Sequence, residues 1–195
     1  MHARRLVARY SRARLIAVVL CAGMLALAEC EPAASAPLCE VLEDRAYTAR
    51  LVRLLDSANR SIKVMMFEAT SYTRHRNSPS NRIIQALIDA AGRGVEVEVI
   101  LDRARPSRRN SASNLITARR LRDGRVEVFL DPVSTTTHTK LVVVDQRYTV
   151  CGSTNWTYSA LARNHEVSLL LDDPDVSDKI ERYFLRVKSS CSAKF

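Results

Sequence analysis

The stretch HTKLVVVD, residues 138–145, decides how this chain is expected to fold. Its interior, Leu141 to Val144, is an uninterrupted aliphatic run with polar residues on both sides. Such a run is typical of a central strand that other elements cover on both faces. His138 and Lys140 are separated by one residue, so on an extended backbone both side chains project to the same face. We therefore expect a buried strand whose first residues present a histidine and a lysine together.

The sequence after this strand continues as alternating short elements. YTVCG, ending at Gly152, predicts a neighbouring strand that returns along the first. Residues 155–164, NWTYSALARN, predict a helix, and residues 166–171, EVSLLL, predict a further buried strand. The last helix is indicated by apolar residues at helical spacing: Val176, Ile180, Tyr183, Phe184 and Val187.

The sequence before the strand shows the same alternation. Helical spacing predicts helices over residues 41–58, 83–92 and 115–124, and strand-forming residues predict strands over 62–67, 95–102 and 125–131. Strands interleaved with helices predict an α/β fold, with a mixed sheet flanked by helices in one domain per chain. No internal repeat is visible.

The first 36 residues read as a targeting segment. Five arginines precede the apolar run Leu15 to Ala28, which is shorter than the roughly 20 residues of a membrane-spanning helix, and small residues at Ala34 to Ala36 offer a cleavage site. We expect a signal peptide over residues 1–36, a catalytic domain over residues 37–195, and export to the periplasm or the medium. A retained segment that anchors the chain to the membrane is the alternative, because Ala26 to Ala28 offer a second cleavage site.

Charge and cysteine content narrow the partners and the covalent chemistry. The net charge is +9, and it stays positive without the leader, which favours an anionic partner such as nucleic acid or a phospholipid surface. In an oxidising compartment a bridge between Cys39 and Cys191 is compatible with the sequence, since domain termini often lie close together, but the sequence leaves the disulfide state of the cysteines open. Cys151 is interpreted as a small buried apolar residue. No cysteine or histidine spacing resembles a zinc site, and no metal or cofactor is expected.

Five polar residues form the candidate site. The strand supplies His138, Lys140 and Asp145, and the glycine turn at Gly152 is followed by Ser153 and Asn155. Together they offer a nucleophile or base, a cation for phosphate oxygens and neutral hydrogen-bond donors, which suits phosphoryl transfer.

These residues resemble the signature of the phospholipase D superfamily, His-x-Lys-x4-Asp followed by Gly-Ser-x-Asn. The match has no departure, and it extends to Asn164 and Glu166 and upstream to the stretch ALIDAAGRGVEVEVILD. The short members with one signature per chain, including bacterial endonucleases, look most similar. The resemblance implies a metal-independent phosphodiesterase with the fold of that superfamily.

The resemblance also implies a role for each residue. His138 attacks phosphorus to form a phosphohistidine, and water then hydrolyses it. Lys140 and Asn155 bind phosphate oxygens with the help of Ser153, and Glu166 fixes the tautomer of His138. Asp145 belongs to the catalytic signature and is expected to orient the site rather than to donate a proton.

The resemblance requires a second histidine, which protonates the leaving group. His75 and His165 lack a lysine partner in sequence, so this second histidine is expected to be His138 of another subunit in a homodimer. His165 is interpreted as structural, His75 as a surface residue and Trp156 as a packing residue rather than a base-stacking one.

Substrate choice must come from the rim of the site. The candidate rim arginines are Arg74 and Arg76 beside His75, then Arg103, Arg105, Arg108 and Arg109, and finally Arg119, Arg120 and Arg122. If they surround the cleft, they favour a non-specific endonuclease acting on DNA or RNA. The alternatives are a phospholipase D acting on lipid head groups and, least favoured, a non-catalytic nucleic-acid-binding module.

Overall fold

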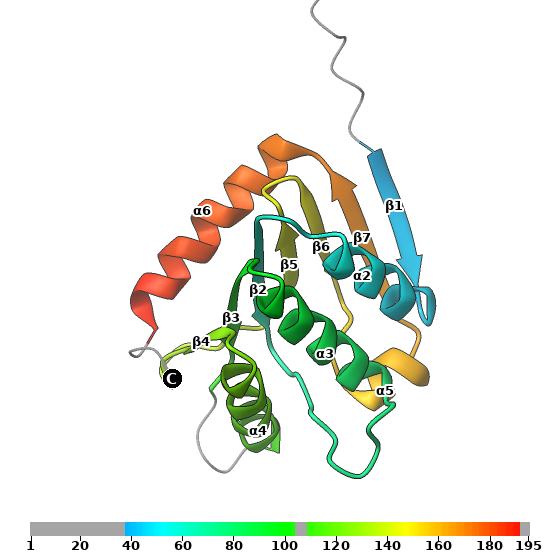
Figure 1. The fold of residues 1–195 in the computed structure, drawn as a ribbon, viewed down its shortest axis with the longest axis vertical. Coiled ribbons are helices and arrows are strands. Elements are labelled where there is room, and N and C mark those ends of the chain that lie inside the picture. Colours follow the sequence, from blue (N-terminus) through cyan, green and yellow to red (C-terminus); the bar gives the residue numbers. More distant parts are fainter. Residues whose placement is uncertain (1–37, 104–108, 192–195) are drawn as a thin grey trace, which may run out of the picture. The chain divides into compact units, whose positions relative to one another are not determined.

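The computed structural model describes residues 38–103 and 109–191, with backbone alone for 109–111, and contains one seven-stranded sheet (Figure 1). The strand order is β1-β7-β6-β5-β2-β3-β4. The strands are β1 (Leu38–Glu43), β2 (Ser61–Met66), β3 (Glu96–Leu101), β4 (Glu127–Leu130), β5 (Lys140–Val144), β6 (Tyr148–Gly152) and β7 (Val167–Asp172). The helices are α2 (Ala46–Asp56), α3 (Pro79–Gly92), α4 (Arg109–Asp123), α5 (Tyr158–Ala162) and α6 (Pro174–Ser190).

The sheet is mixed, as the sequence predicts. Strands β2, β3 and β4 are parallel and are connected through α3 and α4, whereas β5, β6, β7 and β1 run antiparallel to their neighbours. Consequently the last residues of β2 and β6 and the first residues of β5 and β7 lie together at one end of the strands. Functional side chains at these four points can therefore meet.

Each face of the sheet has its own apolar core. On the face of α2 and α3, aliphatic residues of those helices pack on β2, β5 and β6, and Leu51, Leu87 and Val142 are fully buried there. On the other face, α6 covers a smaller cluster around Phe184. Lys188 of α6 also forms an ion pair with the buried Glu98 of β3, which ties the helix to the sheet.

Side-chain caps define where the longer helices begin. Ser78 accepts a hydrogen bond from the Asn81 N–H and is followed by Pro79 at the first position of α3. Asp173 accepts from the N–H groups of Asp175 and Val176 at the start of α6. Both arrangements satisfy backbone donors that the first helical turn leaves unpaired.

The helix predicted over residues 41–58 is wrong at its beginning. Residues Leu38–Glu43 form the edge strand β1, in which Val41 pairs with Leu169 of β7, and the helix begins only at Ala46. An edge strand of this kind buries little of its surface, with Leu42 as its one buried residue, so its alternation is weak in the sequence. The turn at Asp44, whose φ is 45°, separates the two elements.

The bridge between Cys39 and Cys191 that the sequence allows does not form. Cys39, Cys151 and Cys191 are all unpaired. Cys39 lies in the edge strand β1, whereas Cys191 follows the end of α6, where the Lys188 ammonium lies 4.6 Å from the Phe129 ring of β4. The two edges of a seven-stranded sheet are roughly 29 Å apart, far beyond the reach of a disulfide.

The targeting segment expected over residues 1–36 lies outside the described residues. Among the described helices, none has the length and apolar character needed to cross a bilayer.

Candidate active site

The signature residues converge at the edge of the sheet where β5 begins. Lys140 pairs with Met66 at the end of β2, and Gly152 at the end of β6 pairs with Ser168 near the start of β7. His138 precedes the strand by two residues and Glu166 precedes β7 by one. The structure thus brings His138, Lys140, Ser153 and Glu166 to one end of the sheet.

His138 is exposed, and its backbone is held in place from both sides. Its ring meets the Phe67 ring edge-on, with centroids 4.6 Å apart, and the Thr139 carbonyl accepts a hydrogen bond of 2.9 Å from the Phe67 N–H. On the other side, the Thr137 N–H donates to Asp102 at 3.0 Å and the Thr137 hydroxyl donates to Asp131 at 2.6 Å. The His138 ring is thus accessible to solvent, while the backbone on both sides of it is anchored by hydrogen bonds.

Two buried carboxylates of this support were not foreseen from the sequence. Asp102 and Asp131 directly follow β3 and β4, and both are buried against Thr137. A buried carboxylate is costly unless it is hydrogen-bonded, so each indicates a fixed partner. The available signal was the aspartate that ends each of the two predicted strands 95–102 and 125–131.

Lys140 lies in a partly desolvated position with carboxylates nearby. Its Nζ donates to the His138 carbonyl at 2.8 Å and lies 4.9 Å from the centre of the Phe67 ring. Burial lowers the pKa of Lys140 below its ordinary 10.5, although the charges of Glu166, Asp102 and Glu68 act in the opposite direction. A cation beside the candidate nucleophile is suited to contact phosphate oxygens.

Gly152 is required by the close approach of β6 to β7. A Cβ atom at this position would lie 2.3 Å from the Ser168 hydroxyl and 2.4 Å from the Val167 carbonyl oxygen. The glycine therefore brings Ser153 against the start of β7, where the Ser153 N–H donates to the Val167 carbonyl at 3.0 Å. The Ser153 hydroxyl donates to the Glu166 carboxylate.

Glu166 has different partners from the one expected. One of its oxygens accepts from Ser153 and the other accepts from the Asn164 amide at 2.9 Å. Its backbone N–H donates to Asp44 at 2.8 Å, which fixes the start of β7. No hydrogen bond between Glu166 and the His138 ring occurs among the described side chains. Glu166 therefore orients Ser153 directly and affects Lys140 through its charge.

Asn155 contains a buried polar atom without a partner. Its Oδ1 is buried and accepts no hydrogen bond. An unsatisfied buried polar atom costs about 1–3 kcal/mol, so it marks either strain or a site that is completed by another molecule. Trp156, the next residue, is fully buried and its indole N–H donates to the Tyr47 hydroxyl at 3.1 Å. It packs in the core, in agreement with the interpretation from the sequence.

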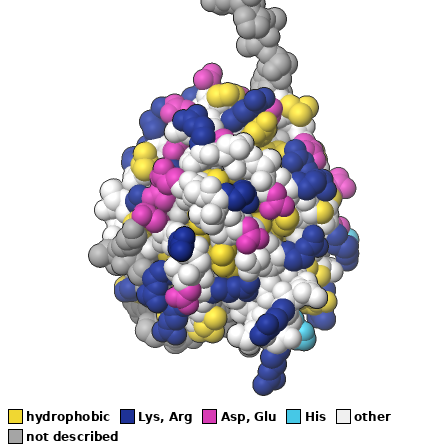
Figure 2. Space-filling model, viewed as in Figure 1, with side chains coloured by type: hydrophobic (Ala, Val, Ile, Leu, Met, Phe, Trp, Pro, Cys, Tyr) yellow, Lys and Arg dark blue, Asp and Glu magenta, His cyan; other side chains and the backbone are white. Residues whose placement is uncertain are grey.

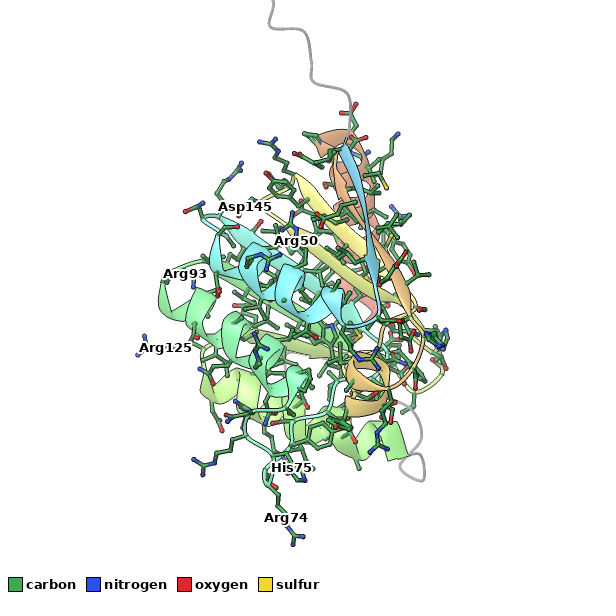
Figure 3. All side chains as sticks on the ribbon, turned by 90° about the vertical axis from the view of Figure 1, so that its right-hand side faces the viewer. Arg50, Arg74, His75, Arg93, Arg125 and Asp145 are labelled. Carbon is green, nitrogen blue, oxygen red and sulfur yellow. The ribbon has the colours of Figure 1, made fainter. Side chains whose placement is uncertain are left out.

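Asp145 lies far from this group and has a structural role instead. It follows the end of β5 opposite to His138, roughly 20 Å away for an extended segment of this length. Figure 3 shows Asp145 and His75 at opposite ends of the molecule. The Asp145 carboxylate accepts hydrogen bonds from the backbone N–H groups of Asn59, Arg60 and Ser61. We therefore correct its assignment from catalytic residue to an anchor for the start of β2.

Among the described residues, two further histidines, His75 and His165, lie outside the group. His165 is 99% exposed and its Nδ1 lies 3.2 Å from Asp44. His75 lies in the loop between β2 and α3, with Arg74 and Arg76. In the residues that the structure describes, no cluster of three or more histidine, cysteine or acidic side chains is arranged to hold a metal ion.

The rim arginines divide into several sets. Arg74 and Arg76 line a hollow beside the site. Arg120 instead donates to Ser71 and Asn81, both at 3.0 Å, and so holds the loop rather than the substrate. Arg103, Arg119 and Arg122 do not line this hollow, while Arg105, Arg108 and the side chain of Arg109 lie outside the described residues.

Comparison with known proteins agrees with this geometry. A family model described as "Cardiolipin synthase, PLD-like domain" matches residues 51–188. The chain therefore belongs to the family of phospholipase D-like domains.

Curated relatives match a smaller part. A phospholipase D of Rickettsia prowazekii is 29% identical over 76 residues, and one of Rickettsia bellii is 32% identical over 69 residues. These matches cover 38% and 35% of this chain. The chain spans 37% and 34% of the length of these two relatives.

Solved structures share the fold over most of the chain. A phospholipase D family member, Nuc from Salmonella typhimurium, has a TM-score of 0.69 at 20% identity and covers 82% of this chain and 98% of its own. NucT from Helicobacter pylori has a TM-score of 0.62 at 21% identity and covers 82% of this chain and 99% of its own. The predicted fold class is thereby confirmed.

Proposed function

We propose that this protein is a non-specific nuclease that cleaves phosphodiester bonds through a phosphohistidine at His138. The observation that carries the proposal is the convergence of His138 with Lys140, Ser153 and Glu166 at one edge of the sheet. A nucleophile, a cation and a hydroxyl held by a carboxylate are the groups that phosphoryl transfer needs.

The reaction has two steps. A ring nitrogen of His138 attacks phosphorus, and the bond from phosphorus to the leaving oxygen breaks as that oxygen takes a proton from a second histidine. Water, deprotonated by the same second histidine, then attacks phosphorus, and the phosphorus–nitrogen bond breaks to regenerate His138. Lys140 holds non-bridging phosphate oxygens throughout, and Asn155 and Ser153 donate hydrogen bonds to them.

The second histidine in this proposal is His138 of a second copy of the chain. An exposed apolar strip near the site supports this dimer: Val41 of β1 and Leu169 of β7 are paired neighbours, and Val167 directly follows Glu166. These side chains are 55%, 38% and 51% exposed. Contiguous exposed apolar residues of this kind are typical of contact surfaces between proteins, and a two-fold axis would use the same strip on both copies.

The dimer can be tested by sedimentation of a Leu169→Glu variant. A charge in the strip is expected to give a monomer that has lost activity, with an unchanged circular dichroism spectrum because the side chain is partly exposed. An active monomer, in the variant or in the unmodified protein, would contradict the shared site.

Nucleic acid is preferred as substrate because the surface beside the site is basic. Arg74, Arg76 and Arg163 line a hollow that also contains Tyr158, three residues after Asn155, and phosphate backbones bind such basic surfaces without regard to sequence. The fold is also shared with Nuc over 98% of that chain. A phospholipase D that hydrolyses lipid head groups is the second candidate, favoured by the names of the Rickettsia relatives.

One set of assays separates these functions. The purified protein is incubated with plasmid DNA, RNA and phosphatidylcholine vesicles in excess chelator, together with a His138→Ala variant and a His165→Ala variant as matched control. We expect cleavage of nucleic acid by the unmodified protein and the control, and none by His138→Ala. Choline release without nucleic-acid cleavage would reverse the ranking of substrates, and a requirement for added metal would refute the phosphohistidine route.

We also propose that the protein is exported, on the basis of its first 36 residues. Cell fractionation with sequencing of the N-terminus is expected to find a shortened chain outside the cytoplasm. A chain that keeps its first residues and sediments with membranes would support the anchored alternative instead.

A further inference from the structure

A basic, aromatic hollow of about 1040 Å³ lies next to the candidate active site. The loop between β2 and α3 forms one wall, and α5 with the residue after it forms the other (Figure 1). The residues that matter for its chemistry are Tyr72, Arg74, His75, Arg76, Tyr158 and Arg163. Arg74 and His75 project from the end of the molecule that carries the site (Figure 3). In the space-filling view, this lower end carries basic side chains, and acidic ones are mostly found higher up (Figure 2).

The loop wall is held in shape by one buried side chain. The amide of Asn81, which is 2% exposed, donates to the carbonyls of Tyr72 at 2.8 Å and His75 at 3.0 Å, and accepts from the Tyr72 N–H at 3.0 Å. Arg120 donates to the same amide oxygen from outside. Because its backbone is tied inward in this way, the loop presents its arginine side chains outward at little cost in conformational entropy.

The hollow is structurally continuous with the active site. The Trp156 N–H donates to the Glu68 carbonyl and the Trp156 carbonyl accepts from the Thr70 N–H, both at 2.9 Å. The Tyr158 N–H then donates to the Tyr72 hydroxyl at 3.0 Å, which joins the two walls. Asn155 therefore lies three residues from Tyr158 along a segment with fixed ends. The candidate site and the hollow are thus linked through this short segment of the chain.

The side chains in the hollow fit an unpaired nucleotide. Tyr158 is 43% exposed, and the Arg163 guanidinium lies 5.2 Å from the centre of its ring, so the pair forms a planar stacking platform. Bases stack on such platforms when they are not already stacked within a duplex, and nearby arginines bind the adjoining phosphates. Polar and charged residues make up most of the loop wall, including Arg74, His75 and Arg76.

We propose that this hollow is a subsite for a single-stranded segment of nucleic acid, in which a base next to the scissile phosphate stacks on Tyr158 and Arg163. The inference rests on the proposed nuclease function and extends it by naming unpaired strands as the preferred substrate. Arg74 and Arg76 contact phosphates of the same strand.

Binding is measured first, in chelator, with full-length protein that carries His138→Ala so that no strand is cut. The probes are a labelled single-stranded oligonucleotide, the duplex of the same sequence and anionic phospholipid vesicles. Tyr158→Ala is expected to weaken single-strand binding by about tenfold or more, and Tyr158→Phe, which keeps the ring, by less than about twofold. Arg163→Glu is expected to lower the slope of log affinity against log salt by about 0.7 or more.

Arg125→Glu is the matched charge-reversal control. Arg125 is exposed and lies two residues before β4, so it lies at the end of the parallel strands opposite to the site. It is expected to leave single-strand binding within about twofold of the parent, since screening weakens charges at that distance. An equal loss in Arg125→Glu and Arg163→Glu would refute the subsite, as would an equal loss of duplex and single-strand binding in Tyr158→Ala.

Cleavage is measured separately, with His138 intact, on the oligonucleotide and on bis(para-nitrophenyl) phosphate. Tyr158→Ala is expected to lower kcat/KM for the oligonucleotide about tenfold and to leave the small diester unchanged, because the small diester does not reach the hollow. If the unmodified protein cuts no nucleic acid, the proposed function fails, and the binding series still decides the subsite. Unchanged binding and cleavage in Tyr158→Ala would refute the subsite alone, and binding of vesicles in place of the oligonucleotide would assign the hollow to lipid.

Discussion

Replacement of Asp145 should destabilise the protein and spare its chemistry. The Asp145 carboxylate accepts 2.8–3.0 Å hydrogen bonds from the N–H groups of Asn59, Arg60 and Ser61. Two of these donors belong to exposed residues that water can satisfy, so we count about 0.5 kcal/mol for each, and about 1.5 kcal/mol for the part-buried Ser61 donor. Asp145 also has a φ of 54°, which costs an alanine about 1 kcal/mol more.

These contributions predict a loss of about 3.5 kcal/mol for Asp145→Ala, or roughly 7–14 °C in Tm for a domain of this size. Asparagine tolerates the left-handed backbone and keeps one accepting oxygen, so Asp145→Asn should cost only about 1 kcal/mol. Calorimetry measures both, with Asp123→Asn as the control because Asp123 is exposed and its ion pair with Arg122 is long, at 3.9 Å.

The pH dependence of Asp145→Asn provides a second readout. Burial alone would raise the pKa of Asp145, but the three N–H donors reverse this and leave its pKa below the ordinary 3.8. A carboxyl whose pKa is lowered by folding stabilises the protein above its unfolded pKa, and this contribution disappears as pH falls through the folded value. The difference in stability between the parent and the variant should therefore be full at neutral pH and shrink below pH 3.8.

The decisive comparison is with activity on bis(para-nitrophenyl) phosphate at 25 °C, well below the melting temperature. We expect kcat for Asp145→Asn to stay within about threefold of the parent. A folded variant with unchanged Tm and a kcat lowered by about a hundredfold would refute the structural role and return Asp145 to the catalytic group.

Three further outcomes are expected. Lys140 must be protonated to bind phosphate oxygens, and its pKa is lowered, so KM should begin to rise at an alkaline pH that is still below 10.5. Lys140→Arg should move this rise to higher pH, because arginine keeps its charge. A pH profile that does not move would exclude Lys140 as the cause of the rise. Gly152→Ala should cost about 3 kcal/mol or more in the free energy of unfolding measured with urea, since a Cβ would overlap Ser168; a neutral result would show that β6 and β7 separate easily. Thr137→Val removes the hydroxyl that donates to Asp131, so it should lower stability by about 1–3 kcal/mol and kcat by about tenfold. An unchanged kcat would show that His138 does not need the hydrogen bond between Thr137 and Asp131.

The central strand and the residues grouped around it could be predicted because their signals are local. The aliphatic run before Asp145 identifies a buried strand, and the spacing of His138 and Lys140 fixes their common face. Gly152 could be assigned to a tight turn, and the structure adds the reason, which is the contact with Ser168.

The parts that could not be predicted depend on distant partners. The roles of Asp102 and Asp131 follow from the parallel pairing of β3 and β4, which brings both strand ends against Thr137. The length of β5 shows from the sequence that Asp145 and His138 lie at opposite ends of the strand. The partners of Asp145 at the start of β2 could not be predicted, because they lie about 85 positions earlier in the chain. Asn81 reads as an ordinary helix residue, and only the folded loop shows that it shapes the hollow.

The most direct test of the account is to trap the covalent intermediate. The protein is mixed with a labelled phosphodiester in chelator, quenched within milliseconds to seconds, and digested for mass spectrometry under alkaline conditions. We expect a phosphoryl group on His138 that appears before product release and is lost in His138→Ala. Full turnover with no adduct at His138 at any time, or an adduct on another residue, would contradict the proposed mechanism.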